Sequence, residues 1–274
     1  MKFKCTFTGV DESTSFIELS NLIRAFPFIE FGILFSYSRA GKEPRYPSLD
    51  FIKEFATWAK AFNTDTSGLD QISIALHICG QAAKDCLQVT EPSDERFATL
   101  KALIPSFDRV QLNINLKEFE LDWLKKSIEI VDRGWSNAMV GWKLESLGKE
   151  YKRPFIIQYN DNNAAMIDFI LPRYLNTYLH VLKDASGGKG VVIDDFSIPK
   201  AATRCGIGFA GGLNVCNVPR ALMKSHDSVM AANVEGHNNN PVYWIDMESG
   251  VRTDDKFDLQ KVREVATIVK EYMG

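Results

Sequence analysis

The sequence predicts a (β/α)8 barrel, an α/β fold in which eight parallel strands form a closed ring inside eight helices. Eight short runs rich in apolar residues recur along the chain, and amphipathic stretches separate them. The runs are apolar on both faces, as is typical of parallel strands that are covered on both sides. The predicted strands are residues 3–9, 28–36, 72–80, 109–115, 154–160, 180–186, 206–212 and 242–249.

The intervening stretches have the spacing of amphipathic helices. The clearest are residues 15–26, 48–62, 119–135, 163–178 and 256–273. A doubly wound open sheet is the alternative, but no Gly-x-Gly-x-x-Gly motif follows the first strand, which disfavours its dinucleotide-binding version. We therefore expect one barrel domain over residues 1–274. Residues 85–105 and 116–152 would form extended loops, the second with Trp123, Trp135 and Trp142 packed as a cap or partner surface.

Composition narrows the class of protein. A net charge of −3 and a pI of about 5.9 argue against nucleic-acid binding through bulk charge. The five cysteines are scattered without a Cys-x-x-Cys pair, and the four histidines have no metal-ligand spacing. No apolar run has the length of a signal sequence or a membrane span. We expect a cytoplasmic protein with no metal, no cofactor, no nucleic acid and no membrane partner.

The carboxyl ends of the predicted strands are polar, and in a barrel these ends form the active-site face. By strand alternation Asp184 shares a face with Leu182, and Asp246 shares one with Trp244 and Glu248. The polar strand ends are Thr8, Cys79, Asn113, Asn115, Gln158, Asn160, Asp184, Asp246 and Glu248. Each residue alone could merely mark the end of a strand. Together they predict a site with two acids and several amides at one mouth.

Five motifs, in order along the chain, resemble those of the phosphoribosylanthranilate isomerase family. They are FGILFS followed by PRYPS (44–48), VQLN (110–113), DASGGKG (184–190), FAGGLNVCNV (209–218) and IDMESGV (245–251). The last three are the most specific. The resemblance extends from about residue 28 to the C-terminus, and it implies a barrel that binds a small phosphorylated ligand.

The resemblance implies an Amadori rearrangement, in which an aminoaldose 5-phosphate opens and becomes an aminoketose. An acid must protonate the ring oxygen and a base must remove a proton from C2. By resemblance, Asp184 is the acid, Asp246 orients the amine side of the substrate, and Arg45 lies near the mouth. The residues implied to hold phosphate are Gly188, Gly211, Gly212, Ser249 and Gly250, near a helix that starts after Leu213.

The chain departs from this family at two positions. Thr8 stands where the family has a cysteine, and a threonine is a poor base. Cys5 should point to the other face of its strand, which leaves Cys79, beside His77, as the candidate thiol. Glu248 replaces a serine beside the expected phosphate, where it would repel the ligand unless it turns away or a group such as Lys189 neutralises it.

Two interpretations remain open at the level of sequence. The first is an isomerase, or a related enzyme acting on a phosphorylated ribose or nucleotide, whose catalytic residues come from Asp184, Asp246, Cys79, Thr8 and Arg45. The second is a non-catalytic protein that binds a sugar phosphate or nucleotide on the same barrel. In either case Asn113 and Gln158 suit sugar hydroxyls or the edge of a base.

Overall fold

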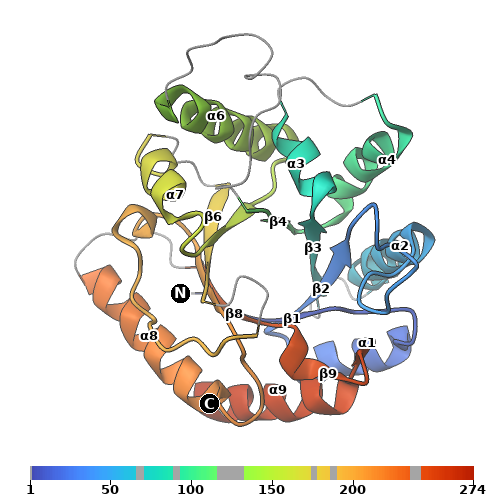
Figure 1. Ribbon diagram of the computed structural model, residues 1–274. Coiled ribbons are helices and arrows are strands. Elements are labelled where there is room, and N and C mark those ends of the chain that lie inside the picture. The colour runs from blue at the N-terminus through green and yellow to red at the C-terminus, as the bar shows by residue number, and fades with distance from the viewer. Residues whose placement is uncertain are drawn as a thin grey trace.

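Eight parallel strands close into a barrel in the order β1 to β8, with β1 hydrogen-bonded to β8, in the computed structural model of the chain (Figure 1). The structure describes residues 2–65, 71–88, 93–115, 133–173, 178–185, 190–234 and 242–274. The strands are β1 (Lys2–Thr8), β2 (Ile29–Phe35), β3 (Ser73–Cys79), β4 (Arg109–Asn113), β5 (Phe155–Tyr159), β6 (Leu179–Asp184), β7 (Ile207–Ala210) and β8 (Val242–Met247). The predicted fold class and all eight predicted strands are confirmed.

The helices lie outside the ring of strands (Figure 1). They are α1 (Phe16–Ala25), α2 (Leu49–Asp65), α3 (Gln81–Leu87), α4 (Glu95–Leu103), α6 (Arg133–Tyr151), α7 (Ala164–Ile170), α8 (Val218–Val234) and α9 (Leu259–Met273). Short 3-10 turns η1 (Ile104–Ser106), η2 (Lys200–Ala202) and η3 (Ser249–Val251) lie between them, and β9 (Arg252–Thr253) pairs with β10 (Lys256–Phe257) as a small hairpin.

Both extended loops of the sequence prediction contain helix. Helix α4 occupies much of residues 85–105, and α6 occupies the second half of residues 116–152. The helix predicted at 119–135 falls mostly outside the described residues, as does Trp123. Trp142 is one of the exposed large apolar side chains.

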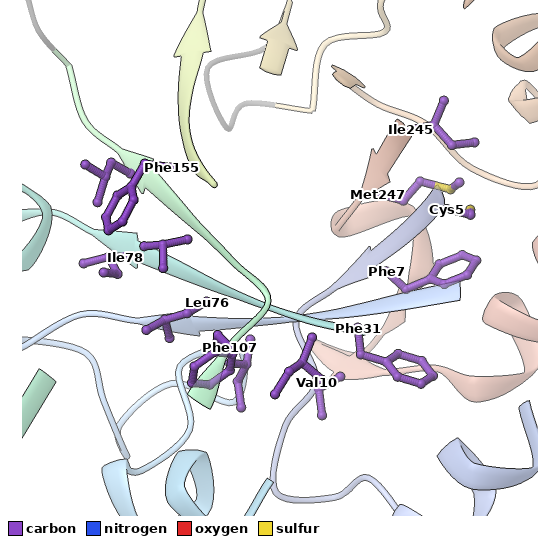
Figure 2. Close-up of a cluster of buried hydrophobic side chains, with 14 of the residues drawn as sticks. Cys5, Phe7, Val10, Phe31, Leu76, Ile78, Phe107, Phe155, Ile245 and Met247 are labelled. Carbon is purple, nitrogen blue, oxygen red and sulfur yellow. The ribbon is translucent and has the colours of Figure 1, made fainter. Parts of the chain in front are cut away.

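The main hydrophobic core fills the space between the strands and the helices (Figure 2). Alternate strand residues point into it, and Cys5 and Phe7 of β1 are both fully buried there. Thr6 and Thr8 of the same strand therefore face the inside of the barrel. The predicted orientation of Cys5, away from the site, is confirmed.

A buried ionic cluster occupies one part of the barrel interior. Glu30 of β2 is 0 % exposed, and it accepts hydrogen bonds from Lys4 at 3.1 Å, Thr6 at 3.0 Å and Ser73 at 2.7 Å. Arg109 of β4 pairs with the same carboxylate. Burial alone would raise the pKa of Glu30, but the positive charges of Arg109 and Lys4 lower it to about 2. The cluster thus links β1, β2, β3 and β4 from the inside.

An apolar layer faces this cluster across the barrel. It consists of Ile156, Leu182, Ala210 and Trp244, from β5 to β8. The Arg109 guanidinium carbon lies 4.3 Å from the centre of the Trp244 ring, which joins the ionic and apolar halves through a cation–π contact. Gly208 makes room for the indole, because a Cβ there would lie 2.1 Å from a Trp244 ring carbon.

Glu30→Gln is expected to lower the free energy of unfolding by about 3–5 kcal/mol, because it leaves Arg109 and Lys4 with an uncompensated buried charge. Urea denaturation at pH 7 measures the loss. Glu43→Gln is the matched control, since Glu43 forms an exposed pair with Arg39 at 3.7 Å that contributes about 0.5 kcal/mol or less. A loss below about 1 kcal/mol for Glu30→Gln would show that the cluster does not hold these strands together.

Candidate active site

A cavity opens at the carboxyl ends of the strands and collects most of the predicted site residues. Its polar and glycine lining comprises Thr8, Arg45, His77, Gln111, Asn113, Gln158, Asp184, Gly190, Gly211, Gly212, Asp246, Glu248 and Ser249. Cys79 and Gly250 are not part of this lining, and Gly188 and Lys189 lie outside the described residues. The predicted convergence of two acids and several amides on one mouth is confirmed.

The two acids occupy one level of the barrel. Asp184 of β6 is in register with Ala210 of β7, and Ala210 is in register with Asp246 of β8. One strand separates the two carboxylates, so their Cα atoms are roughly 10 Å apart. Both side chains line the cavity, where they can face a sugar-sized ligand from two sides.

Asp246 is held against Thr8 of the neighbouring strand. The Thr8 hydroxyl donates a 2.7 Å hydrogen bond to Asp246 Oδ1, and Asp246 is 7 % exposed. Burial raises the pKa of Asp246 to about 7, and nearby Glu248 and Glu30 act in the same direction. The Thr8 hydrogen bond and the Arg109 charge partly oppose this rise. Asp246 can therefore exchange a proton near neutral pH.

Asp184 lies at the end of β6 and is 4 % exposed. Its Oδ2 accepts a 3.0 Å hydrogen bond from the Gln158 side chain of β5. The backbone N–H of Ala185 donates to the Ala210 carbonyl at 3.3 Å, which fixes the chain directly after the acid. Asp184 is thus a buried carboxyl at the cavity wall.

Uncharged polar groups from β3 and β4 form another part of the wall. His77 is 2 % exposed, and burial lowers its pKa to about 3, so its ring is neutral at physiological pH. Its Nε2 and the Oε1 of Gln111 have no hydrogen-bond partner among the described residues. Gln111 donates its amide N–H to Asn113 Oδ1 at 2.8 Å. Gly32 gives His77 and Thr8 their space, because a Cβ there would lie 3.1 Å from His77 Nε2 and 2.5 Å from Thr8 Oγ1.

Neither thiol near the site is suited to act as a base. Burial raises the pKa of Cys79 to about 12, and its sulfur accepts a 3.4 Å hydrogen bond from the Asn113 amide. Burial also raises the pKa of Cys5 well above its ordinary value. Both thiols therefore stay protonated at neutral pH, and the prediction of Cys79 as a catalytic residue loses its chemical support.

Arg45 pairs with Glu248, the carboxylate that stands where the resemblance leads us to expect a serine. Its Nη1 donates to Glu248 at 3.1 Å, and its Nη2 and Nε donate to Asp255 at 2.6 and 3.0 Å. Burial raises the pKa of Glu248, whereas the charge of Arg45 lowers it. Arg45 lies near the mouth as expected, with its charge shared between two protein carboxylates.

A second arginine, missed in the sequence, joins the loops after β1 and β8. Arg252 donates to the Gly9 carbonyl at 2.5 Å and to Asp11 Oδ2 at 3.0 Å, and both charged side chains are buried. The Phe257 N–H donates to the same Asp11 oxygen at 2.7 Å. Gly9 has φ +104°, and a Cβ there would lie 2.5 Å from the Arg252 guanidinium. The only feature of the sequence that could have indicated this pair is an acid, Asp11, soon after the first strand.

Backbone crowding explains the glycines of the β7 and β8 loops. Gly211 and Gly212 have φ +124° and +54°, and Cβ atoms there would lie 2.8 Å from the Val191 carbonyl and 2.7 Å from the Gly190 carbonyl. A Cβ at Gly250 would lie 1.9 Å from the Leu213 carbonyl oxygen. Their predicted binding of phosphate stays a prediction.

The helix predicted after Leu213 is α8. Helix α8 starts at Val218, because Asn214 first forms a turn in which its side chain accepts the Cys216 N–H at 2.9 Å. Within the described residues no group of three or more His, Cys, Asp or Glu side chains has the arrangement of a metal site. Among the helices of that same part of the chain, none combines the length and apolar character needed to span a membrane.

The comparison with known families agrees with the motifs. Residues 149–267 match the family described as N-(5'phosphoribosyl)anthranilate (PRA) isomerase. Over this stretch the chain is similar to the PRA isomerase family. It contains the three most specific motifs of the sequence, so the predicted resemblance is confirmed there, whereas Thr8 and Arg45 lie before it. No curated protein matches the chain in sequence.

Solved structures agree on the fold. PRA isomerase from Pyrococcus furiosus is 14 % identical, with a TM-score of 0.52 over 98 % of this chain and 99 % of that one. The enzyme from Thermotoga maritima, solved as monomers of a dimeric protein, is 13 % identical, with a TM-score of 0.50 over 98 % and 99 %. A D-psicose 3-epimerase is 12 % identical, with a TM-score of 0.52 over 100 % and 97 %. At these identities the likeness shows the fold.

The buried state of Asp246 has a measurable effect on stability. Its pKa is higher in the folded than in the unfolded chain, so the folded state binds more protons between about pH 4 and 7 and loses stability as pH rises through this range. Asp246→Asn removes this dependence. We expect the variant to gain roughly 1–3 kcal/mol relative to the parent chain between pH 5 and pH 8 in urea unfolding. Asp227→Asn, on an exposed position of α8, is the control, and a difference that does not change with pH would contradict the assignment.

Proposed function

We propose that this chain isomerises a phosphorylated N-substituted ribosylamine from the aldose to the ketose form, with Asp184 as general acid and Asp246 as general base. The observation that carries the proposal is the pair of buried carboxylates at one level of the barrel, of which one has a pKa of about 7. The PRA isomerase family match over residues 149–267 supports the reaction class.

In the first step, Asp184 protonates the ring oxygen while the C1–O bond breaks. The lone pair of the substituent nitrogen moves toward C1 and forms a C=N bond, so the ring opens to an iminium. Asp184 suits this step by its position, because its side chain lines the cavity and is 4 % exposed. The Gln158 amide keeps the Asp184 carboxyl oriented toward the cavity.

In the second step, Asp246 removes the proton from C2. The C2–H electrons form a C1=C2 bond, and the C=N electrons return to nitrogen, which gives an enolamine. The enolamine then loses the proton of its C2 hydroxyl and gains one at C1, which produces the ketone. A base with a pKa of about 7 can both accept and return a proton at neutral pH.

Thr8 serves in this proposal as a positioning residue for the base. It stands where the resemblance expects a cysteine, and it donates its hydroxyl to Asp246 on the adjacent strand. The base is therefore displaced from β1 to β8. The phosphate would bind near Gly211, Gly212, Ser249 and Gly250, on the two loops where backbone N–H groups are typically available to an anion.

A non-catalytic binding protein is the second candidate. The observation that favours it is the lack of a reactive thiol, since Cys5 and Cys79 both have raised pKa values. Such a protein would bind the phosphorylated ligand at the same cavity and release no proton from C2. Measurement of C2 proton exchange separates the two candidates directly.

Asp184→Asn keeps the shape of the acid and removes its transferable proton. The substrate is ribose 5-phosphate deuterated at C2 and condensed with aniline, and mass spectrometry measures the loss of deuterium to water. We expect turnover to fall by about 10²–10⁴-fold while affinity for the ligand changes little. Asp161→Asn, on an exposed turn after β5, is the control. Undiminished turnover in Asp184→Asn would refute the acid, and no exchange by the parent chain, with the ligand bound, would favour the binding protein.

Thr8→Val removes the hydrogen bond that lowers the pKa of Asp246. Because the base must be deprotonated, the rate of deuterium loss should rise with pH through about 7 in the parent chain. In Thr8→Val this rise should move to higher pH, by roughly 1 unit if the bond contributes about 1 kcal/mol. Thr8→Ser restores the hydroxyl and should restore the profile. A profile identical in Val and Ser variants would show that Thr8 does not act through Asp246, and Thr8→Cys tests whether a thiol at this position adds activity.

A further inference from the structure

The polar lining of the cavity is divided by charge. The acids are Asp184 of β6, Asp246 of β8 and Glu248, which directly follows β8. The side chains from β3, β4 and β5 are all uncharged at neutral pH, and they are His77, Gln111, Asn113 and Gln158. A ligand whose phosphate lies at the β7 and β8 loops would extend its other end toward this uncharged wall.

Arg45 is the one cation among the described lining residues, and three of its five N–H donors already bind protein carboxylates. Two nitrogens donate to Asp255 and a third donates to Glu248. The side chain is 34 % exposed and lines the mouth of the cavity, where Glu248 and Asp255 hold it. A carboxylate on the ligand would have to share this arginine with both of them.

Two buried polar atoms on the uncharged wall make no hydrogen bond within the described part of the chain. They are His77 Nε2 and Gln111 Oε1, and buried polar atoms are normally satisfied. An amide oxygen accepts hydrogen bonds only, so Gln111 Oε1 calls for a hydroxyl or N–H on the ligand. A carboxylate beside Gln111 Oε1 would bring acceptors to an acceptor and leave this amide oxygen unsatisfied.

We infer that the group carried by the ribose nitrogen of the substrate is uncharged or cationic, donates hydrogen bonds and has no carboxylate, unlike anthranilate. This inference rests on the proposed function and specifies its substrate class. Glu248 is the selecting residue, because it holds Arg45 and adds a negative charge at the mouth.

The test compares two stable open-chain ligands that differ by one carboxylate, N-ribitylanthranilate 5-phosphate and N-ribitylaniline 5-phosphate. Isothermal titration calorimetry measures the dissociation constant of each for the parent chain. We expect the aniline compound to bind at least tenfold more tightly, because the other ligand places a carboxylate among protein carboxylates, and Arg45, the cation of the described lining, is already paired with two of them. Equal affinity, or tighter binding of the anthranilate compound, overturns the inference and leaves the proposed function standing.

Glu248→Gln tests the selecting residue while keeping its shape. The variant frees one donor of Arg45, so affinity for the anthranilate compound should rise about fivefold or more while that for the aniline compound changes little. Glu264→Gln, on an exposed position of α9, should change neither. If Glu248→Gln does not fold, Asp255→Asn releases the other side of Arg45. Unchanged affinity for the anthranilate compound in a folded variant overturns the role of Glu248, and failure of the parent chain to bind either compound overturns the proposed function itself.

Discussion

The ion pair between Glu30 and Arg109 is the constraint on which the rest of the barrel interior depends. It joins β2 to β4 past the intervening β3, and Arg109 then stacks on Trp244 of β8. A charge buried in this way is stable only while each partner remains in place. The same two charges act on Asp246 in opposite directions, since Arg109 lowers its pKa and Glu30 raises it. The stability of the Glu30–Arg109 ion pair and the pKa of Asp246 are therefore coupled.

In the proposed mechanism, the carboxyl of Asp246 takes the place of a reactive cysteine thiol. A thiolate would need a cysteine with a low pKa, and burial makes the thiols beside this site unsuitable. A carboxyl needs the opposite treatment, because burial raises its pKa toward neutrality. The same desolvation thus keeps the Cys79 thiol protonated and brings the pKa of Asp246 close to neutral pH. Thr8 keeps this effect moderate through one hydrogen bond.

The pattern of apolar residues along the chain predicted the strands and the directions of their side chains, but it did not predict contacts between distant segments. The eight strands follow from the recurrence of short apolar runs, and the inward direction of Asp184 and Asp246 and the outward direction of Cys5 follow from alternation along a strand. The partners of Glu248 and Asp11 did not follow, because Arg45 and Arg252 lie about 200 residues or more away along the chain. The start of helix α8 at Val218 did not follow either, because side-chain turns at Asn214 compete with the helix and the spacing of apolar residues does not indicate such turns.

The seam between the first and last strands has a consequence for folding. Thr8 and Asp246 are 238 residues apart in sequence, and they meet only where β1 pairs with β8. Arg252 and Asp11 fasten the same seam from the loops above. In a chain whose ring is still open, Asp246 would be a solvated carboxyl with an ordinary proton affinity. Its ability to exchange a proton at neutral pH is thus acquired at ring closure, so that partly folded chains carry the residue without its chemistry.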